Sequence, residues 1–217
     1  MHDVNLTVFD FDYDLTWWAF LISADERVYS RFGGSDGPDP SALLSVDGLK
    51  HTMRLVLEEH KRSKGTMQAP PKIVRPMDLF EMKGKCMHCH QVNEAFYKAE
   101  KKKKKEFSLA KVRYLPLAED IGVTISIDKG NVIDKVVKDS AAAKAGLRAG
   151  DTLRQVRGTP ILSQGDLMWT LKYGPSAGPL PLTFQRGTET LDVVLDLPAG
   201  WKDSPDLSWR KSAAKLK

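Results

Sequence analysis

The first sixty residues alternate between apolar runs and breaks in a way that predicts three elements. Residues 17–22 and 28–32 are rich in aromatic and branched side chains, and the polar turn at residues 24–26 separates them. After a break rich in glycine and proline, apolar residues recur at helical spacing across residues 43–60. The pattern predicts a β-hairpin followed by an amphipathic helix.

Beyond residue 114, short β-rich runs alternate with glycine turns. Between the second and third runs, Ser140 can cap a short alanine-rich helix, Gly146 can end it, and Gly150 supplies a second tight reversal. The predicted strands cover residues 123–127, 132–137 and 152–156. The fold class is therefore α+β.

The residues between these two parts contain few apolar positions and several prolines, which is typical of a connector. A helix is expected from near Asn93, and the five lysines at 101–105 extend it as a solvated face. We therefore divide the chain into a hairpin and helix unit (1–62), a connector (63–113), a β-rich module (114–198) and a tail (199–217).

The charge balance argues against a specific nucleic-acid partner. The formal net charge is +5, but the single lysine run supplies that excess, so the basicity is local. An acidic partner or a membrane surface is the alternative interpretation of this run. No apolar stretch approaches the roughly 18 to 20 residues of a membrane helix, and no export signal is visible after Met1.

The glycine-containing segment DSAAAKAGLRAGD, residues 139–151, resembles the signature of bacterial PDZ domains. In that family a short helix leads into an Ala-Gly-Leu turn and then a Gly-Asp corner. The resemblance extends over about residues 115–197 with the elements in the same order, and Ala141 stands where the family often has proline. It implies a further helix over residues 163–171 and closing strands over residues 180–185 and 191–195. It implies a small, partly open β-barrel with two helices that binds an extended peptide as an added strand.

The resemblance also implies which residues bind the peptide. The carboxylate-binding loop falls at residues 120–123, and the binding strand continues to Ile125. On the second helix, Gln164 and Met168 are four residues apart and face the groove, while Leu167 and Leu171 face the core. Core or solvent positions are the alternative for these helix residues. The implied peptide-binding residues are Asp120, Ile121, Gly122, Val123, Ile125, Gln164 and Met168.

Asp120 departs from the family pattern, which commonly has glycine or a neutral residue at this position. A carboxylate there would repel the terminal carboxylate of a ligand. An internal segment, or a neighbouring domain docked into the groove, would avoid that repulsion. The sequence shows no Ser-His-Asp constellation upstream, so we expect no trypsin-like protease.

The hairpin at residues 20–34 and the helix after it resemble the C-terminal half of a thioredoxin fold, over roughly sixty residues. Thioredoxins carry their dithiol earlier in the chain and a cis-proline just before the hairpin, but here no cysteine precedes the hairpin and Thr16 stands near the position of the proline. No thioredoxin active site is carried over. An incomplete unit of this kind exposes a sheet edge, which a truncated chain or pairing with another element would explain.

The connector contains Cys86-Met87-His88-Cys89-His90, which has the Cys-x-x-Cys-His spacing of c-type cytochromes. This resemblance implies covalent haem c on Cys86 and Cys89, with His90 as the axial iron ligand. Met77, Met82 or His88 are the candidates for a further ligand. Because attachment normally occurs outside the cytoplasm, haem would imply a periplasmic or other extracytoplasmic location.

Three other interpretations of this segment stay open. Thiolates and imidazoles from Cys86, Cys89, His88 and His90 suit tetrahedral zinc, which His51 or His60 would have to complete. The two cysteines also suit a dithiol switch, or they are ordinary linker residues.

The sequence as a whole is consistent with two functions. The PDZ resemblance implies an interaction protein that binds a peptide or a neighbouring domain, and a haem or dithiol centre would imply an extracytoplasmic electron-transfer protein.

Overall fold

The computed structural model describes residues 4–14, 17–35, 39, 41–63, 73–76, 88–102, 115–203 and 210, except the side chains of residues 99–101. Helices and strands are mixed along the described ranges, which confirms the predicted fold class at that level. Among the helices in these ranges, none has the length and apolar character needed to span a membrane.

The first unit contains the hairpin and the helix that the sequence predicts. Strand β1 (Trp18–Ile22) pairs antiparallel with β2 (Val28–Gly33). Helix α1 (Val46–Arg62) follows, and the Ser45 hydroxyl caps its start by accepting a 2.8 Å bond from the Gly48 N–H. The likeness of this unit to thioredoxin stays a prediction, because the elements alone do not test it.

Helix α3 (Cys89–Lys102) begins four residues before the expected start near Asn93. Its first turns pack on residues near the start of the chain, where Leu6, Tyr13 and Val92 form a small buried cluster. Phe11, Cys89 and Phe96 pack against that cluster. Burial of one helical face therefore fixes the early start, which the local sequence pattern alone did not indicate.

The last part of the described chain forms two sheets around one apolar core. The two-stranded sheet has the order β3-β4, the four-stranded sheet has the order β6-β5-β7-β8, and a bridge between Val132 and Thr152 links them. The strands are β3 (Val123–Ile125), β4 (Ile133–Val136), β5 (Thr152–Val156), β6 (Thr159–Pro160), β7 (Gly178–Arg186) and β8 (Glu189–Leu197). The helical segments are η2 (Ala118–Ile121), η3 (Ile127–Lys129), α4 (Ala141–Lys144) and α5 (Gln164–Lys172).

Strand lengths differ from the sequence prediction for reasons of pairing. Strand β3 ends two residues early, because its register with β4 shifts after Thr124 and the chain turns into η3. Strands β7 and β8 are longer than predicted, because they pair without a gap from Gly178 opposite Leu197 to Arg186 opposite Glu189. The two predicted glycine reversals are confirmed, with φ of 82° at Gly146 and 88° at Gly150.

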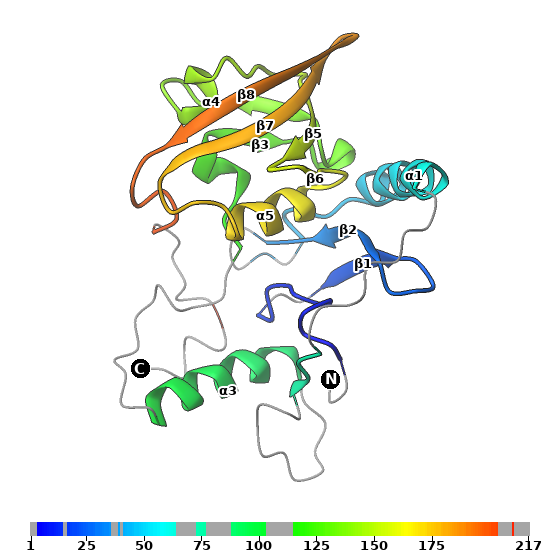
Figure 1. Ribbon diagram of the computed structural model, residues 1–217, viewed down its shortest axis with the longest axis vertical. Coiled ribbons are helices and arrows are strands. Elements are labelled where there is room, and N and C mark those ends of the chain that lie inside the picture. Colours follow the sequence, from blue (N-terminus) through cyan, green and yellow to red (C-terminus); the bar gives the residue numbers. More distant parts are fainter. Residues whose placement is uncertain are drawn as a thin grey trace.

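Helix α5 lies between the four-stranded sheet on one side and strand β2 on the other (Figure 1). Leu167 and Leu171 point into the core of the sheets, as predicted, and both are fully buried. Trp201, from the segment predicted as a tail, packs in that same core. Helix α5 thus joins the two halves of the molecule.

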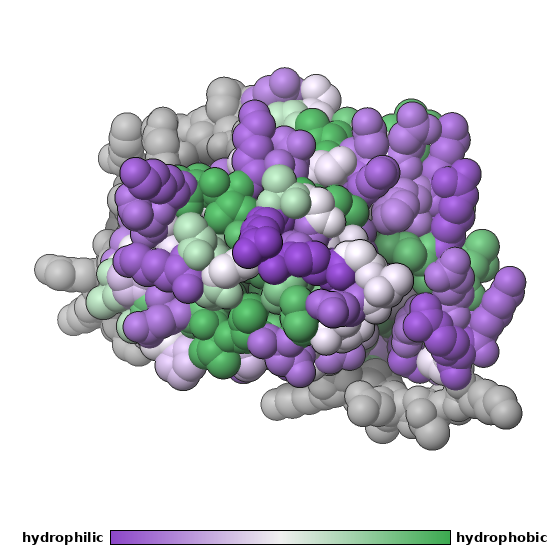
Figure 2. Space-filling model, turned by 90° about the horizontal axis from the view of Figure 1, so that it is seen from above, coloured by the Kyte–Doolittle hydropathy of each residue, from purple (hydrophilic) through white to green (hydrophobic). Residues whose placement is uncertain are grey.

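On the face seen from above in Figure 2, hydrophobic side chains form small groups separated by hydrophilic ones.

Candidate functional site

The predicted groove lies where η2, β3 and α5 meet. In the described part of the chain, β3 pairs with β4 along one edge and has no strand partner along the other. Segment η2 contacts both β3 and α5 (Figure 1). An unpaired strand edge presents backbone N–H and C=O groups, so this edge has the chemistry needed to accept an added strand.

Gly122 shapes the loop that leads into β3. Its φ of 89° lies in the left-handed region, and a Cβ at this position would collide with Ser140. The N–H of Gly122 donates to Glu119 at 2.9 Å, and its carbonyl accepts from Val137 at 2.9 Å. The loop therefore requires glycine for both its backbone conformation and its close contact with α4.

Asp120 turns its carboxylate back toward its own 3-10 turn. One carboxylate oxygen accepts a 2.8 Å hydrogen bond from the Leu117 N–H, and the side chain is partly exposed. Partial burial raises the pKa of Asp120 above its usual value, while the bond from Leu117 opposes that shift. Asp120 thus holds the loop in place and also puts a carboxyl group beside it.

The structure brings the other predicted groove residues together, but as buried side chains. Ile121, Val123 and Ile125 belong to the core of the two sheets. On α5, Gln164 is 6% exposed and Met168 is 1% exposed. A groove open to solvent would leave the helix wall accessible, so another part of the molecule covers this wall.

The chain that follows β2 covers Met168. A Cβ at Gly34 would lie 3.1 Å from the Met168 Sδ and 3.3 Å from the Leu43 Cδ1. The start of α1 reaches η3, the turn after β3, where the Ser45 hydroxyl donates to the Ile127 carbonyl at 3.3 Å. His51 Nε2 also lies 3.2 Å from Asn131 Oδ1. The N-terminal unit therefore contacts α5 and the turn after β3.

Polar contacts fix β2 on α5. The Arg31 N–H donates to one oxygen of Asp166 at 2.9 Å, and the Ser30 hydroxyl donates to the other at 2.6 Å. The Ser163 hydroxyl donates in turn to the Arg31 carbonyl. Burial raises the pKa of Asp166 to about 6, while these bonds and the Arg31 charge partly oppose the shift.

The side chain of Arg31, from β2, packs on α5. Its guanidinium lies 3.9 Å from the centre of the Trp169 ring and 3.8 Å from the Asp166 carboxylate. Nearby, the Lys172 ammonium binds both carboxylate oxygens of Asp10, at 2.8 and 2.9 Å. Stacking and charge pairing thus anchor both the hairpin and the first described segment to α5.

Sequence reasoning missed Asp166, although a signal for it exists. Ser163 and Asp166 have the Ser-x-x-Asp spacing of a capping box, and the Ser163 hydroxyl does accept from the Asp166 N–H at 3.1 Å. That spacing predicts a local role at the start of α5. The contacts from Ser30 and Arg31 span more than 130 residues, so only the tertiary structure reveals them.

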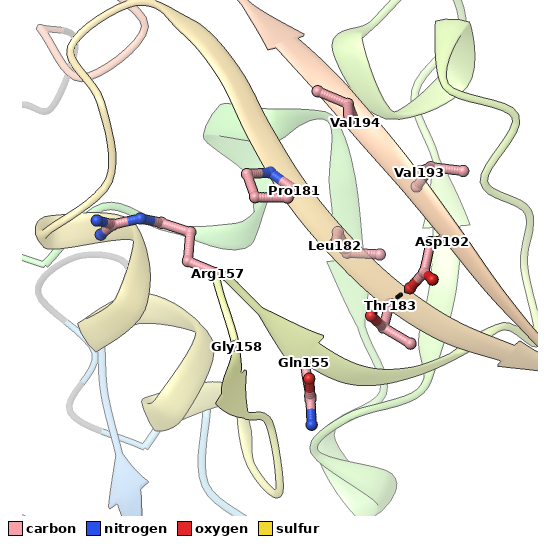
Figure 3. A pocket seen from close by; sticks show the side chains of 9 residues that line it. All are labelled: Gln155, Arg157, Gly158, Pro181, Leu182, Thr183, Asp192, Val193 and Val194. Atoms are coloured by element: carbon pink, nitrogen blue, oxygen red, sulfur yellow. Dashed lines mark hydrogen bonds between the residues drawn. The ribbon is translucent and has the colours of Figure 1, made fainter.

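A separate hollow of about 310 Å³ lies on the outer face of the four-stranded sheet. Figure 3 shows it over β7 and β8, where the Thr183 hydroxyl donates to Asp192 at 2.6 Å. The side chain of Arg157 points away from the other labelled residues and donates to the Tyr173 carbonyl. None of the seven predicted peptide-binding residues lines this hollow. Its lining residues are Gln155, Arg157, Gly158, Pro181, Leu182, Thr183, Asp192, Val193 and Val194.

The cysteine and histidine segment is described only from His88 onward, so Cys86, Met77 and Met82 lie outside the described residues. Cys89 packs against the buried cluster at the start of α3, and His90 Nε2 lies 3.7 Å from a Glu94 carboxylate oxygen. The His88 and His90 rings are nearly parallel, with centres 5.9 Å apart. The haem, zinc and dithiol interpretations of this segment therefore stay predictions, because Cys86 lies outside the described residues.

Comparison with protein families identifies the β-rich part of the chain. The family model described as PDZ domain matches residues 119–197. A curated protein, the probable periplasmic serine endoprotease DegP-like of Pseudomonas putida (strain W619), is 30% identical over 109 residues. That match covers 45% of this chain and 22% of the endoprotease.

Two solved structures are also similar to part of the chain. The serine endoprotease from Yersinia pestis is 25% identical, covers 36% of this chain and 28% of its own, and has a TM-score of 0.32. The HtrA3 PDZ domain bound to a phage-derived ligand (FGRWV) is 23% identical, covers 35% of this chain and 81% of its own, and has a TM-score of 0.30. These matches extend over little more than a third of the chain.

Proposed function

We propose that the PDZ domain formed by residues 119–197 is a non-proteolytic interaction module that binds an extended protein segment between β3 and α5. The observation that carries the proposal is the unpaired edge of β3 beside α5, reached through the left-handed turn at Gly122. A segment added at that edge gains backbone hydrogen bonds, and Met168 supplies an apolar side chain for selectivity.

The preferred ligand is an internal segment rather than a chain terminus. Asp120 places a carboxyl group at the loop where PDZ domains capture a terminal carboxylate, and like charges repel at short range. A segment without a free terminal carboxylate, or a docked neighbouring domain, avoids this repulsion. The chain shares only 22% of the length of its curated endoprotease relative, and its own sequence shows no protease triad. An interaction role therefore suits it better than proteolysis.

A peptide titration of the full chain tests this proposal. The pentapeptide FGRWV, which the HtrA3 PDZ domain binds, serves as the probe in free and amidated forms. We expect NMR chemical-shift changes at Gly122, Val123 and Met168, which lie on the loop, the strand and the helix that border the groove.

The amidated form tests the ligand type, because it lacks the charge that Asp120 repels. Equal or tighter binding of the amidated peptide supports an internal ligand. NMR shift changes confined to Pro181, Thr183 and Val194 would contradict the assignment of the groove.

The name of the endoprotease relative also places that protein in the periplasm, and we infer an extracytoplasmic location for this chain.

Covalent haem at Cys86, Cys89 and His90 stays a prediction, as do the zinc and dithiol alternatives. Expression in an export-competent host that matures c-type cytochromes tests it. Haem would give a Soret band whose colour survives acid-acetone extraction, and Cys89→Ser should lose it because one thioether is removed. A colourless protein with two titratable thiols would exclude haem and favour the dithiol, whereas stoichiometric bound zinc would favour the metal site.

A further inference from the structure

The strongest feature outside the groove itself is the N-terminal unit that lies on its helix wall. Met168 and Gln164 are the side chains expected to meet a ligand, yet both are buried. Gly34 lies beside Met168, and Ser45 and Gly48 lie against the carbonyl of Ile127 in η3, just after β3. The same N-terminal unit therefore contacts the helix wall of the proposed binding site and the turn that follows its strand wall.

Two glycines allow this close approach, one on each side of the contact. In α5, a Cβ at Gly165 would collide with the backbone oxygen of Arg31. In α1, a Cβ at Gly48 would collide with the backbone oxygen of Ile127. Backbone atoms cannot rotate away as side chains can, so an added methyl group at either position must push the two surfaces apart.

We propose that the N-terminal unit is an autoinhibitory cover of the PDZ groove, and that a ligand binds only when this unit moves off α5. This inference rests on the proposed function and adds the regulation of the same site. A ligand then competes with an intramolecular partner, so its apparent affinity falls in proportion to the fraction of molecules with an open groove. The contacts that hold the cover closed are those that Ser30, Arg31 and Ser163 make around Asp166.

Gly165→Ala and Gly48→Ala in the full chain test the cover from its two sides. Alanine favours a helix more than glycine by about 1 kcal/mol, so neither change weakens its own helix. Gly48→Ala also leaves the PDZ domain unaltered, which keeps the test valid if Gly165→Ala disturbs α5. Arg54→Ala, at an exposed position of α1, is the matched control.

Two measurements test the covering of Met168 and the binding of peptide independently of each other. Oxidation of Met168 by dilute hydrogen peroxide, followed by peptide mass spectrometry, reports whether the wall is accessible. Fluorescence anisotropy with labelled, amidated FGRWV reports binding. We expect both glycine variants to oxidise Met168 at least about tenfold faster and to bind about tenfold more tightly, since the open fraction rises. Arg54→Ala should match the wild type in both measurements.

Each other outcome overturns the inference in a distinguishable way. If Met168 becomes accessible while affinity stays at the wild-type value, binding occurs without opening and the cover is not inhibitory. If Met168 stays protected in both variants, the N-terminal unit is not what buries it. If Met168 becomes accessible and no variant binds the peptide at millimolar concentration, the proposed function fails together with its regulation.

Discussion

Asp166 serves two structural units at once. Its backbone N–H bonds to Ser163 at the start of α5, while its carboxylate accepts bonds from Ser30, Arg31 and the Leu162 N–H. The side chain is 2% exposed, so it depends on these donors rather than on water. A single buried carboxylate therefore links the start of the PDZ helix to the hairpin that covers it.

Asp166 should make stability depend on pH. Its pKa is about 6 in the folded protein and near 3.8 in the unfolded chain, so between these values the folded protein holds a proton that the unfolded chain has released. The free energy of unfolding should therefore fall by up to about 3 kcal/mol from this group as pH rises from 4 to 7. Asp166→Asn should lack this component.

Urea unfolding at several pH values measures the effect as the difference between wild type and Asp166→Asn. Asp12, another buried carboxylate with a raised pKa, is present in both proteins and cancels in that difference. Two curves that run parallel from pH 4 to 7 would show that Asp166 does not titrate in this range.

At the scale of the elements, the PDZ core extends past its last strand. Trp201 is 6% exposed, and its indole N–H donates to the Pro175 carbonyl at 3.0 Å. The Lys202 ammonium donates to the carbonyls of Lys172 and Gly174, at 3.1 and 2.8 Å. A positive charge is favourable at the C-terminal end of a helix, where the helix dipole is negative, so Trp201 and Lys202 stabilise the C-terminal end of α5.

Trp201→Ala should destabilise the PDZ domain by about 3–5 kcal/mol, because it removes a large buried side chain. Trp201→Phe keeps most of the apolar volume and loses the bond to Pro175, so it should cost much less. Thermal or urea unfolding compares the two. If alanine costs less than about 1 kcal/mol, the stable domain ends at residue 198, where the sequence analysis placed its boundary.

At the scale of the whole molecule, a buried ion pair joins residues close to the two ends of the chain. The Arg210 guanidinium donates to one oxygen of Asp12 at 2.7 Å and also to the other, and it lies 3.6 Å from Asp14. Asn93 of α3 donates to Asp14 at 2.9 Å. This cluster connects the first described segment, α3 and the C-terminal region through charges shielded from water.

Arg210→Ala should cost about 3–5 kcal/mol, because it leaves the Asp12 carboxylate buried without its cation. Burial already raises the pKa of Asp12 in spite of Arg210. The double variant Asp12→Asn with Arg210→Ala removes both charges of this pair, so it should recover a large part of the loss. Urea unfolding of the single and double variants forms a double-mutant cycle. Equal losses for Arg210→Ala and the double variant would mean that the pair contributes packing rather than charge compensation.

Local pattern indicated most of the elements of this protein, although not all of their ends. The spacing of glycines around residues 139–151, together with alternating apolar residues, predicted the strands, the two helices and the PDZ resemblance that the family match confirms. Glycine signals of this kind report backbone conformation directly, so they need no knowledge of distant contacts. The hairpin and α1 were predictable from their apolar runs and from the helical spacing of apolar residues.

Contacts between distant residues were decided only by the tertiary structure. The sequence indicated that Gln164 and Met168 share a helix face, but not that Gly34 lies against that face. It indicated a cap at Ser163 and not the bonds from β2 to Asp166, and it placed the start of α3 four residues late. Periodicity defines which side of an element is apolar. What covers that side depends on packing between units far apart in the chain, where no local pattern carries a signal.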